Sequence, residues 1–429
     1  MQKIEYPSVG EVFYCDTLPN GLKLSVIPKP GFARCFAQFA TRYGGADRRF
    51  RLGGSFIDTP MGVAHFLEHK MFDMPSGDNA LAVLAANGAQ PNAYTSSGVT
   101  AYHFESTSGF DENLRMLLKF VSTPYFTDES VRKEQGIIGQ EIRMGEDDPD
   151  RVIYDELLRC LYDHHPVRDS VAGTVESIAE ITPETLYNCH RIFYNPGNMA
   201  LAVVGDVDPE AVRDAAVEIL PAEAGEVPGR DYGAPEGPLP AKARFSRAMA
   251  VSAPQFLIGA KLLPGLRGGE AQRQRLIAAL SLRMLCGSSS PFFTRLYAEG
   301  TLNMDFDYEV DASAGTLTMI VGGESKTPEK VLEEFNAEIA RIVREGFDEA
   351  FFIRSRRTSL GARLRALEDF DNVCVSLAMD CFDGYCTFDS YKILEGITAE
   401  DCRRFVETEL APERLALSVI APKSGEAKA

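Results

Sequence analysis

The sequence predicts an α+β fold of two related domains, each with helices packed on a mostly antiparallel sheet, and three observations support it. The chain has 429 residues, whereas a single hydrophobic core stops growing at about 250–300 residues. A stretch rich in Pro, Gly and Ala at residues 221–243 indicates a linker between two domains. Strand-like and helix-like segments alternate irregularly on both sides of it. We therefore expect an N-terminal domain at residues 1–222, a linker at 223–245 and a C-terminal domain at 246–429.

The elements expected in the N-terminal half follow from turn residues and hydrophobic periodicity. The turn dipeptide Asn20-Gly21 precedes a strand, and helices are expected where apolar residues recur at helical spacing. We expect strands at residues 22–26, 36–43, 93–104 and 200–204, and helices at 62–72, 80–86, 112–121, 128–144 and 209–220. The apolar stripe expected for the helix at 128–144 consists of Val131, Ile137, Ile138 and Ile142.

The C-terminal half has elements of the same kinds, although its sequence does not repeat that of the first half. Strands are expected at residues 256–262 and 315–322. Helices are expected at residues 270–285, 328–344 and 349–365. The shared kinds of element are compatible with an old duplication of one domain.

The composition excludes some classes of partner. Hydrophobic residues make up 45% of the chain and charged residues 25%, the balance of a globular protein. The net charge of −18 argues against nucleic-acid or anionic-membrane partners, since both require basic surface. No stretch approaches the roughly 20 apolar residues that a membrane span requires, and the first residues lack the apolar run of a signal peptide.

The cysteines point to a reducing compartment. There are nine, an odd number, scattered along the chain without a CxxC pair. Reduced thiols in the core of a cytoplasmic protein explain this usage better than disulfides or a zinc knuckle. We therefore expect a cytoplasmic protein.

Two of the six histidines, His65 and His69, lie four residues apart in a segment expected to be helical. Four residues make about one turn, so both imidazoles project from one face and can bind one tetrahedral Zn²⁺. Glu68 is placed to take a proton from a metal-bound water and later protonate a leaving amine. The order His-x-x-Glu-His is a known zinc-peptidase signature. The competing interpretation is an amphipathic helix whose charged residues face solvent.

A catalytic zinc also needs a third protein ligand and an open position. The helix expected at 128–144 offers Glu134 and Glu141, which are seven residues apart and share a face, and Glu146 follows. Each acid taken alone is equally compatible with a solvated helix face. The residues by themselves leave the choice among these three acids open.

The run from Val63 to Phe72, with His65-Phe66-Leu67-Glu68-His69 inside it, resembles the zinc helix of the insulinase/pitrilysin peptidases. Within that family, the sequence resembles a bacterial subgroup similar to mitochondrial processing peptidase. That family has a distal glutamate some seventy residues later, preceded by another glutamate seven residues earlier. The resemblance implies that Glu141 is the third zinc ligand and that Glu134 is a carboxylate that orients a ligand histidine. It also implies two homologous domains that form half of a clamshell.

A second match concerns substrate binding. The segment Asn92-Ala93-Tyr94-Thr95 resembles the edge strand on which the family holds its substrate. The resemblance implies that a peptide adds to this strand through backbone hydrogen bonds, which give affinity independent of sequence. The alternative is an ordinary edge strand. His164 and His165 lie in a segment that resembles a family segment, which we interpret as structural. A second metal site at these two histidines is disfavoured, because adjacent side chains point apart.

One departure from the family pattern bears on partners. Members that work as homodimers usually carry an Arg and a Tyr, seven apart, in the second domain. Our alignment places Tyr297 and Met304 at these positions, and Arg295 is present at the wrong spacing. We therefore expect a heterodimer with a homologous subunit that carries the Arg/Tyr pair, or otherwise a homodimer.

The motif and the family resemblance together predict a zinc metalloendopeptidase, and the resemblance implies that it hydrolyses unfolded peptides. The alternatives are a non-catalytic scaffold subunit of a heterodimeric processing complex, a maturation factor for one dedicated peptide, and a non-enzymatic interaction protein in which the motif arose by chance. The intact His65, Glu68, His69 and Glu141 argue against the scaffold, because inactive relatives usually lose these residues.

Overall fold

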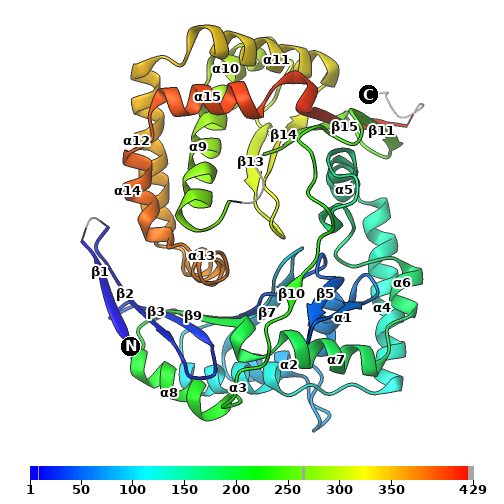
Figure 1. The fold of residues 1–429 in the computed structure, drawn as a ribbon, viewed down its shortest axis with the longest axis vertical. Helices are drawn as coiled ribbons and strands as arrows, with labels where there is room; N and C mark the ends of the chain where they lie inside the picture. The colour runs from blue at the N-terminus through cyan, green and yellow to red at the C-terminus, as the bar shows by residue number, and fades with distance from the viewer. Residues whose placement is uncertain (8, 263–265, 424–429) are drawn as a thin grey trace. The chain divides into compact units, whose positions relative to one another are not determined.

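The computed structural model describes residues 1–7, 9–262 and 266–423 (Figure 1). The chain forms two compact units, and neither is continuous in sequence. Unit 1 comprises Met1–Ile142, Ser170–Tyr232 and Leu364–Phe388, and unit 2 comprises Arg143–Asp169, Gly233–Arg363 and Asp389–Ala429. Each unit therefore contains segments from both sides of the expected domain boundaries at residues 222 and 246. Those boundaries stay a prediction.

Unit 1 contains a seven-stranded sheet in the order β1-β2-β3-β9-β4-β8-β7, in which only the pair β3 and β9 is parallel. Its strands are β1 (Gln2–Tyr6), β2 (Glu11–Thr17), β3 (Lys23–Pro28), β4 (Cys35–Thr41), β7 (Ala89–Thr95), β8 (Thr100–Ser106) and β9 (Met199–Gly205). A smaller sheet in the order β10-β5-β6 joins β10 (Gly229–Arg230), β5 (Arg49–Leu52) and β6 (Ser55–Asp58).

Helices cover both faces of the large sheet in unit 1 (Figure 1). One face packs into the main core with helices α1 (Val63–Lys70), α2 (Ala80–Ala86), α3 (Phe110–Ser122), α4 (Asp128–Asp147), α7 (Pro183–Phe193) and α8 (Pro209–Ile219). The other face is covered by α13 (Phe370–Asp383), whose Ala378 packs against Ala40, Ala101 and Ala200. Every residue of β4 and β9 is consequently buried, as expected for strands covered on both sides.

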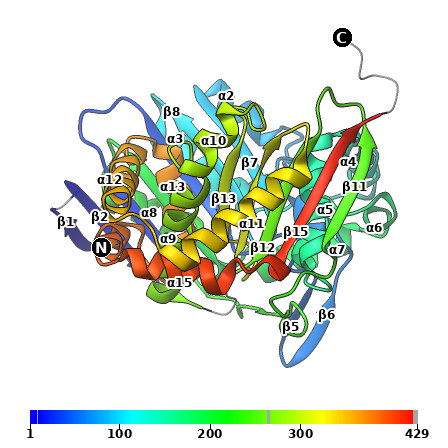
Figure 2. The same cartoon turned by 90° about the horizontal axis from the view of Figure 1, so that it is seen from above.

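Unit 2 contains a five-stranded sheet in the order β11-β15-β12-β14-β13, in which only β11 and β15 are parallel. Its strands are β11 (Arg244–Met249), β12 (Gln255–Lys261), β13 (Asp307–Asp311), β14 (Thr318–Glu324) and β15 (Leu415–Pro422). One face packs against α5 (Pro149–Leu161), and the other carries α9 (Gly268–Cys286) and α11 (Pro328–Glu345) (Figure 2). The remaining helices are α6 (Val175–Ala179), in unit 1, and α10 (Pro291–Ala298), α12 (Glu349–Ala366), α14 (Ser390–Glu395) and α15 (Ala399–Glu409).

The two sheets share one topology. The order β3-β9-β4-β8-β7 corresponds strand by strand to β11-β15-β12-β14-β13, with the same parallel first pair and antiparallel remainder. Each unit also takes one covering helix from the opposite half of the sequence, α13 in unit 1 and α5 in unit 2. The predicted fold class, two homologous α+β domains with mostly antiparallel sheets, is confirmed.

Several helices begin as their sequences dictate. The side chains of Asp148, Thr182, Asp208 and Ser290 each accept a hydrogen bond from a backbone N–H in the first turn of α5, α7, α8 and α10. A proline follows each of these capping residues in that turn, where a missing N–H costs nothing.

Three expectations need correction. Residues 93–104 are not one extended segment but parts of β7 and β8, which pair as a hairpin. Ile137 is 47% exposed and does not belong to the apolar stripe of α4, whereas Val131, Ile138 and Ile142 are buried. The stretch Gly268–Ala298 does reach the length and hydropathy of a membrane span, although 72% of its apolar window is buried. Side chains of α9 and α10 form part of the core of unit 2, and this burial accounts for the hydropathy of the stretch.

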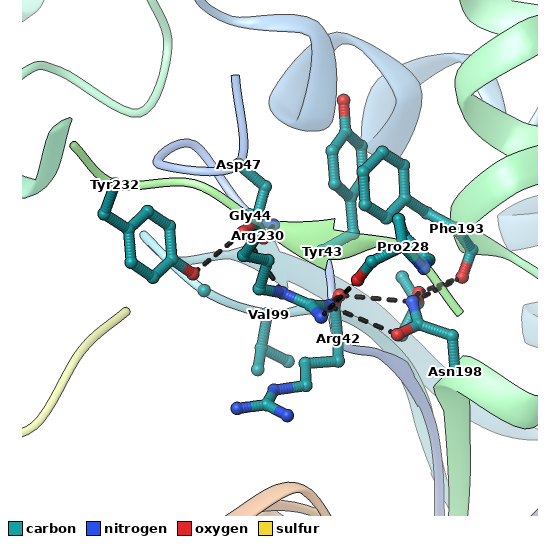
Figure 3. Close-up of polar contacts among 12 residues, drawn as sticks. Arg42, Tyr43, Gly44, Asp47, Val99, Phe193, Asn198, Pro228, Arg230 and Tyr232 are labelled. Carbon is teal, nitrogen blue, oxygen red and sulfur yellow. Dashed lines mark hydrogen bonds and ion pairs between the residues drawn. The ribbon is translucent and has the colours of Figure 1, made fainter. Parts of the chain in front are cut away.

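The Pro/Gly-rich stretch is anchored on unit 1 around Asp47 (Figure 3). The wholly buried carboxylate of Asp47 accepts hydrogen bonds from Gly44 N (2.9 Å) and Tyr232 Oη (2.8 Å), and pairs with Arg230 Nε (3.2 Å). Burial raises the pKa of Asp47, and Arg230 opposes that shift. Arg230 also donates to the backbone carbonyl of Arg42 and to Asn198. Residues up to Tyr232 thus belong to the packed body of unit 1.

The same stretch is anchored on unit 2 by Glu236. Its Oε1 accepts hydrogen bonds from the backbone N–H groups of Asp163 (2.9 Å), His164 (2.8 Å) and His165 (2.9 Å), and its Oε2 lies 3.0 Å from Lys261 Nζ. Burial disfavours the carboxylate, but these donors outweigh it and lower the pKa of Glu236 to about 2.

Replacing Glu236 by Gln is expected to lower the free energy of unfolding by about 1–3 kcal/mol near neutral pH, because the buried Lys261 ammonium and three backbone N–H groups lose a charged acceptor. The carboxyl pKa rises from about 2 in the fold to its ordinary 4.5 on unfolding. The stabilisation is therefore complete above pH 4.5 and is lost as the pH falls toward 2. Denaturant unfolding at several pH values, with the exposed Glu223→Gln as control, measures this. A Glu236→Gln deficit that does not shrink with acid would contradict it.

Candidate metal centre

The helix α1 presents its polar residues on one face because the other face is committed to the core. It begins after Gly62, whose φ is 91° and where a Cβ would lie 2.6 Å from the carbonyl oxygen of Ala172. Only glycine fits there. The side chains of Val63, Ala64, Phe66 and Leu67 are buried. His65, Glu68 and His69 therefore lie together on the opposite side.

The helix α4 supplies acidic side chains to the same place. Its buried Val131, Ile138 and Ile142 pack in the core of unit 1. Glu134 and Glu141 are two turns apart, which puts both on the side that faces α1.

His65, His69 and Glu141 form a compact group of ligand-type atoms. One nitrogen or oxygen from each lies within 4.8 Å of the others. His65 Nε2 is 3.4 Å from Glu141 Oε1, and His69 Nε2 is 3.7 Å from Glu141 Oε2. The two imidazole rings have centroids 4.6 Å apart. Within the described part of the chain, this is the one such group of three His, Cys, Asp or Glu side chains.

Glu134 fixes the orientation of His69. Its Oε1 lies 3.0 Å from His69 Nδ1, and its Oε2 is 3.6 Å from Nζ of the buried Lys70. Burial disfavours the charged form of both side chains. The hydrogen bond to Glu134 and the surrounding carboxylates nevertheless raise the pKa of His69, and the contacts with His69 and Lys70 lower the pKa of Glu134. The Glu134 carboxylate therefore accepts from Nδ1, which leaves Nε2 directed at Glu141.

Glu68 is held from the neighbouring strand. Thr95 Oγ1 donates to Glu68 Oε2 at 2.6 Å and lies 3.3 Å from Thr100 Oγ1. Thr95 is the last residue of β7, the strand at the edge of the sheet. The sequence placed Thr95 on a substrate-binding strand but did not reveal this contact, because nothing in residue spacing links positions 68 and 95.

The other predicted edge-strand residues also lie on β7, whose only paired neighbour among the described strands is β8. Ala93 packs toward the main core and Tyr94 toward the α13 side, in the alternation of a regular strand. Asn92 is exposed, and its Oδ1 accepts from the backbone N–H of Ala93.

Two other candidates fall outside the group. Glu146 is exposed at the end of α4 and is not among the clustered ligand atoms. His164 Nε2 is bonded to the carbonyl oxygen of Ala234 (2.7 Å), and His165 Nδ1 accepts from Val167 N (3.1 Å). The imidazole rings of His164 and His165 are thus engaged in hydrogen bonds with the backbone.

Comparison with known proteins matches nearly the whole chain. The profile of the insulinase family (peptidase family M16) matches residues 52–175, and that of the peptidase M16 inactive domain matches residues 180–359. The first match contains every residue of the centre described above. The protein YmfH of Bacillus subtilis (strain 168), named an uncharacterized zinc protease, is 37% identical over 99% of this chain and all of its own length.

Solved structures agree in fold. An M16-like peptidase from Alicyclobacillus acidocaldarius is 34% identical, with a TM-score of 0.92 over 98% of this chain and 100% of that one. A peptidase M16 inactive domain from Pseudomonas fluorescens has a TM-score of 0.80 at 14% identity, over 96% of this chain and 98% of that one. At that identity the second likeness shows the fold alone.

Proposed function

This chain belongs to the insulinase family of zinc peptidases, peptidase family M16, and we propose that it is an active zinc endopeptidase that hydrolyses unfolded peptides. The observation that carries the proposal is the group of His65, His69 and Glu141 beside a carboxylate, Glu68, that is fixed by a hydrogen bond.

The ligand atoms suit zinc in kind and in spacing. Two imidazole nitrogens and one carboxylate oxygen are a common catalytic set. Bonds of about 2.0–2.1 Å in a tetrahedron place two ligand atoms about 3.3 Å apart, and His65 Nε2 lies 3.4 Å from Glu141 Oε1. The buried Nδ1 of His65 has no hydrogen-bond partner in the described chain, so Nε2 is the atom of that ring that faces the group. A bound zinc ion supplies Lewis acidity, which polarises a peptide carbonyl and makes water a stronger acid.

The side chains divide the remaining work. Glu68 takes the proton of the attacking water and delivers it to the leaving amine. Glu134 keeps His69 in one tautomer and one orientation. The open edge of β7, at Asn92, Ala93, Tyr94 and Thr95, takes an extended peptide as an added strand. Main-chain recognition of this kind favours unfolded substrates, because a folded protein has no free strand to add.

We further propose that the active assembly is a heterodimer in which a homologous subunit supplies an Arg/Tyr pair, with a homodimer as the alternative. Tyr297 and Met304, at the corresponding positions, are both exposed. Arg295 cannot substitute for the missing arginine without breaking its ion pair with Glu334 (2.9 Å). The nine free thiols favour a cytoplasmic location.

One experiment tests both proposals. The assembly purified from its native host is expected to cleave an unfolded peptide, to lose that activity with a chelator and to regain it with zinc. The control substrate is a folded protein with the same amino-acid composition as the unfolded peptide. A second homologous chain should co-purify. Absence of chelator-sensitive cleavage in the intact assembly would overturn the enzymatic function, and full activity of this chain alone would overturn the heterodimer.

A further inference from the structure

We propose that Thr95 is the positioning residue of the catalytic base: its hydroxyl holds one oxygen of Glu68 and leaves the other to accept the proton of water. The inference rests on the proposed peptidase function. It assigns to Thr95 a task beyond its place on the substrate strand.

The contact has the character of a strong hydrogen bond. At 2.6 Å, the separation of Thr95 Oγ1 and Glu68 Oε2 is in the range of a hydroxyl bound to an ionised carboxylate, about 2.5–2.7 Å. Glu68 Oε1 receives no hydrogen bond from any described residue. The two carboxylate oxygens are therefore unequal, and Oε1 is the one left free to meet a water molecule.

The proton of the Thr95 hydroxyl has one competing acceptor, and that acceptor is weaker. Thr100 Oγ1 lies 3.3 Å away and donates its own proton to the carbonyl oxygen of Tyr43 (2.9 Å). A neutral hydroxyl oxygen at that distance attracts a proton less than a carboxylate at 2.6 Å. Once Oε1 has taken the proton of water, Oε2 becomes a carbonyl-type oxygen, which Thr95 still satisfies as a donor.

This arrangement ties the base to the strand that is proposed to hold the substrate. Thr95 ends β7, and Glu68 lies on α1, which packs beside β7. Holding Glu68 requires the hydroxyl group of Thr95 but not its methyl group. Serine at position 95 should therefore preserve the function that valine removes.

The test compares Thr95→Val, which keeps the shape, with Thr95→Ser, which keeps the hydroxyl. In the intact zinc-loaded assembly, Thr95→Val is expected to lower kcat about 10- to 100-fold, because the base is no longer oriented, with KM and zinc content unchanged. Thr95→Ser should have nearly the wild-type kcat. The control is Thr358→Val, which removes a hydroxyl that bonds only the carbonyl oxygen of Arg354 (2.9 Å) in α12.

A crystal structure of each variant supplies a readout that does not depend on activity. The Glu68 carboxylate should leave its position or become disordered in Thr95→Val and keep it in Thr95→Ser. An unmoved Glu68 in Thr95→Val, or equal losses of kcat in both variants, would overturn the role of Thr95. If the wild-type assembly cleaves no peptide, the peptidase proposal fails, while the position of Glu68 in the two crystal structures still decides whether Thr95 holds it.

Discussion

Glu68→Gln abolishes peptide cleavage and leaves the metal in place: this is the expected result with the largest effect on rate. Glutamine has the shape of glutamate, and its amide oxygen can still accept from Thr95. The amide nitrogen, however, cannot take a proton from water. Loss of a general base costs about 10²- to 10⁴-fold in kcat. The rate of cleavage of an unfolded peptide and the zinc content of the same preparation measure the two parts of the prediction.

The control for Glu68→Gln is Glu129→Gln, which makes the same chemical change at an exposed position of α4. It should alter neither rate nor zinc content. Retained cleavage in Glu68→Gln would remove Glu68 from the role of base. Loss of zinc from that variant would instead make Glu68 a ligand, which its separation from the clustered atoms of His65, His69 and Glu141 does not favour.

His65→Ala is expected to remove the metal altogether, from one zinc per chain to none after dialysis. The variant keeps only two of three protein ligands, and alanine cannot replace a nitrogen donor. Glu134→Gln should be milder, weakening zinc affinity about 10- to 100-fold, because such partners orient a ligand without touching the metal. Elemental analysis and competition with a chelator distinguish the two degrees of loss.

Two matched variants serve as controls for the metal. His164→Ala removes an imidazole that bonds a backbone carbonyl in unit 2, and Glu146→Gln removes the acid that the sequence left as a possible ligand. Both should retain full zinc content. A zinc content in His65→Ala equal to that of the wild type would place the metal elsewhere, and loss in Glu146→Gln would return that acid to the candidates.

The sequence predicts the parts of this centre that lie on regular helices. The offsets of four from His65 to His69 and of seven from Glu134 to Glu141 match one and two helical turns, so the spacing along the sequence already predicts which side chains share a face. The same reasoning fails for Ile137, which lies beside the apolar stripe of α4 in sequence but is 47% exposed. An apolar residue that is next to a buried stripe in sequence can still point away from the core.

Contacts between elements distant in sequence are not predictable in this way. The hydrogen bond from Thr95 to Glu68 depends on how β7 packs beside α1. The anchoring of the Pro/Gly-rich stretch depends on Asp47 and Glu236, whose partners lie far away along the chain. Proline and glycine predict a linker here, but they carry no information about the acidic side chains that fix it.

The exchange of α5 and α13 between the units has a consequence for biosynthesis. Domains usually fold in order as they emerge from the ribosome, but the first sheet here lacks its second cover until residues 370–383 have been made. Until then the face that carries Ala40, Ala101 and Ala200 has no helix to bury it. This apolar face of the sheet therefore stays uncovered during most of the synthesis of the chain. A stop codon between the two halves would therefore release an aggregation-prone fragment and not a smaller enzyme.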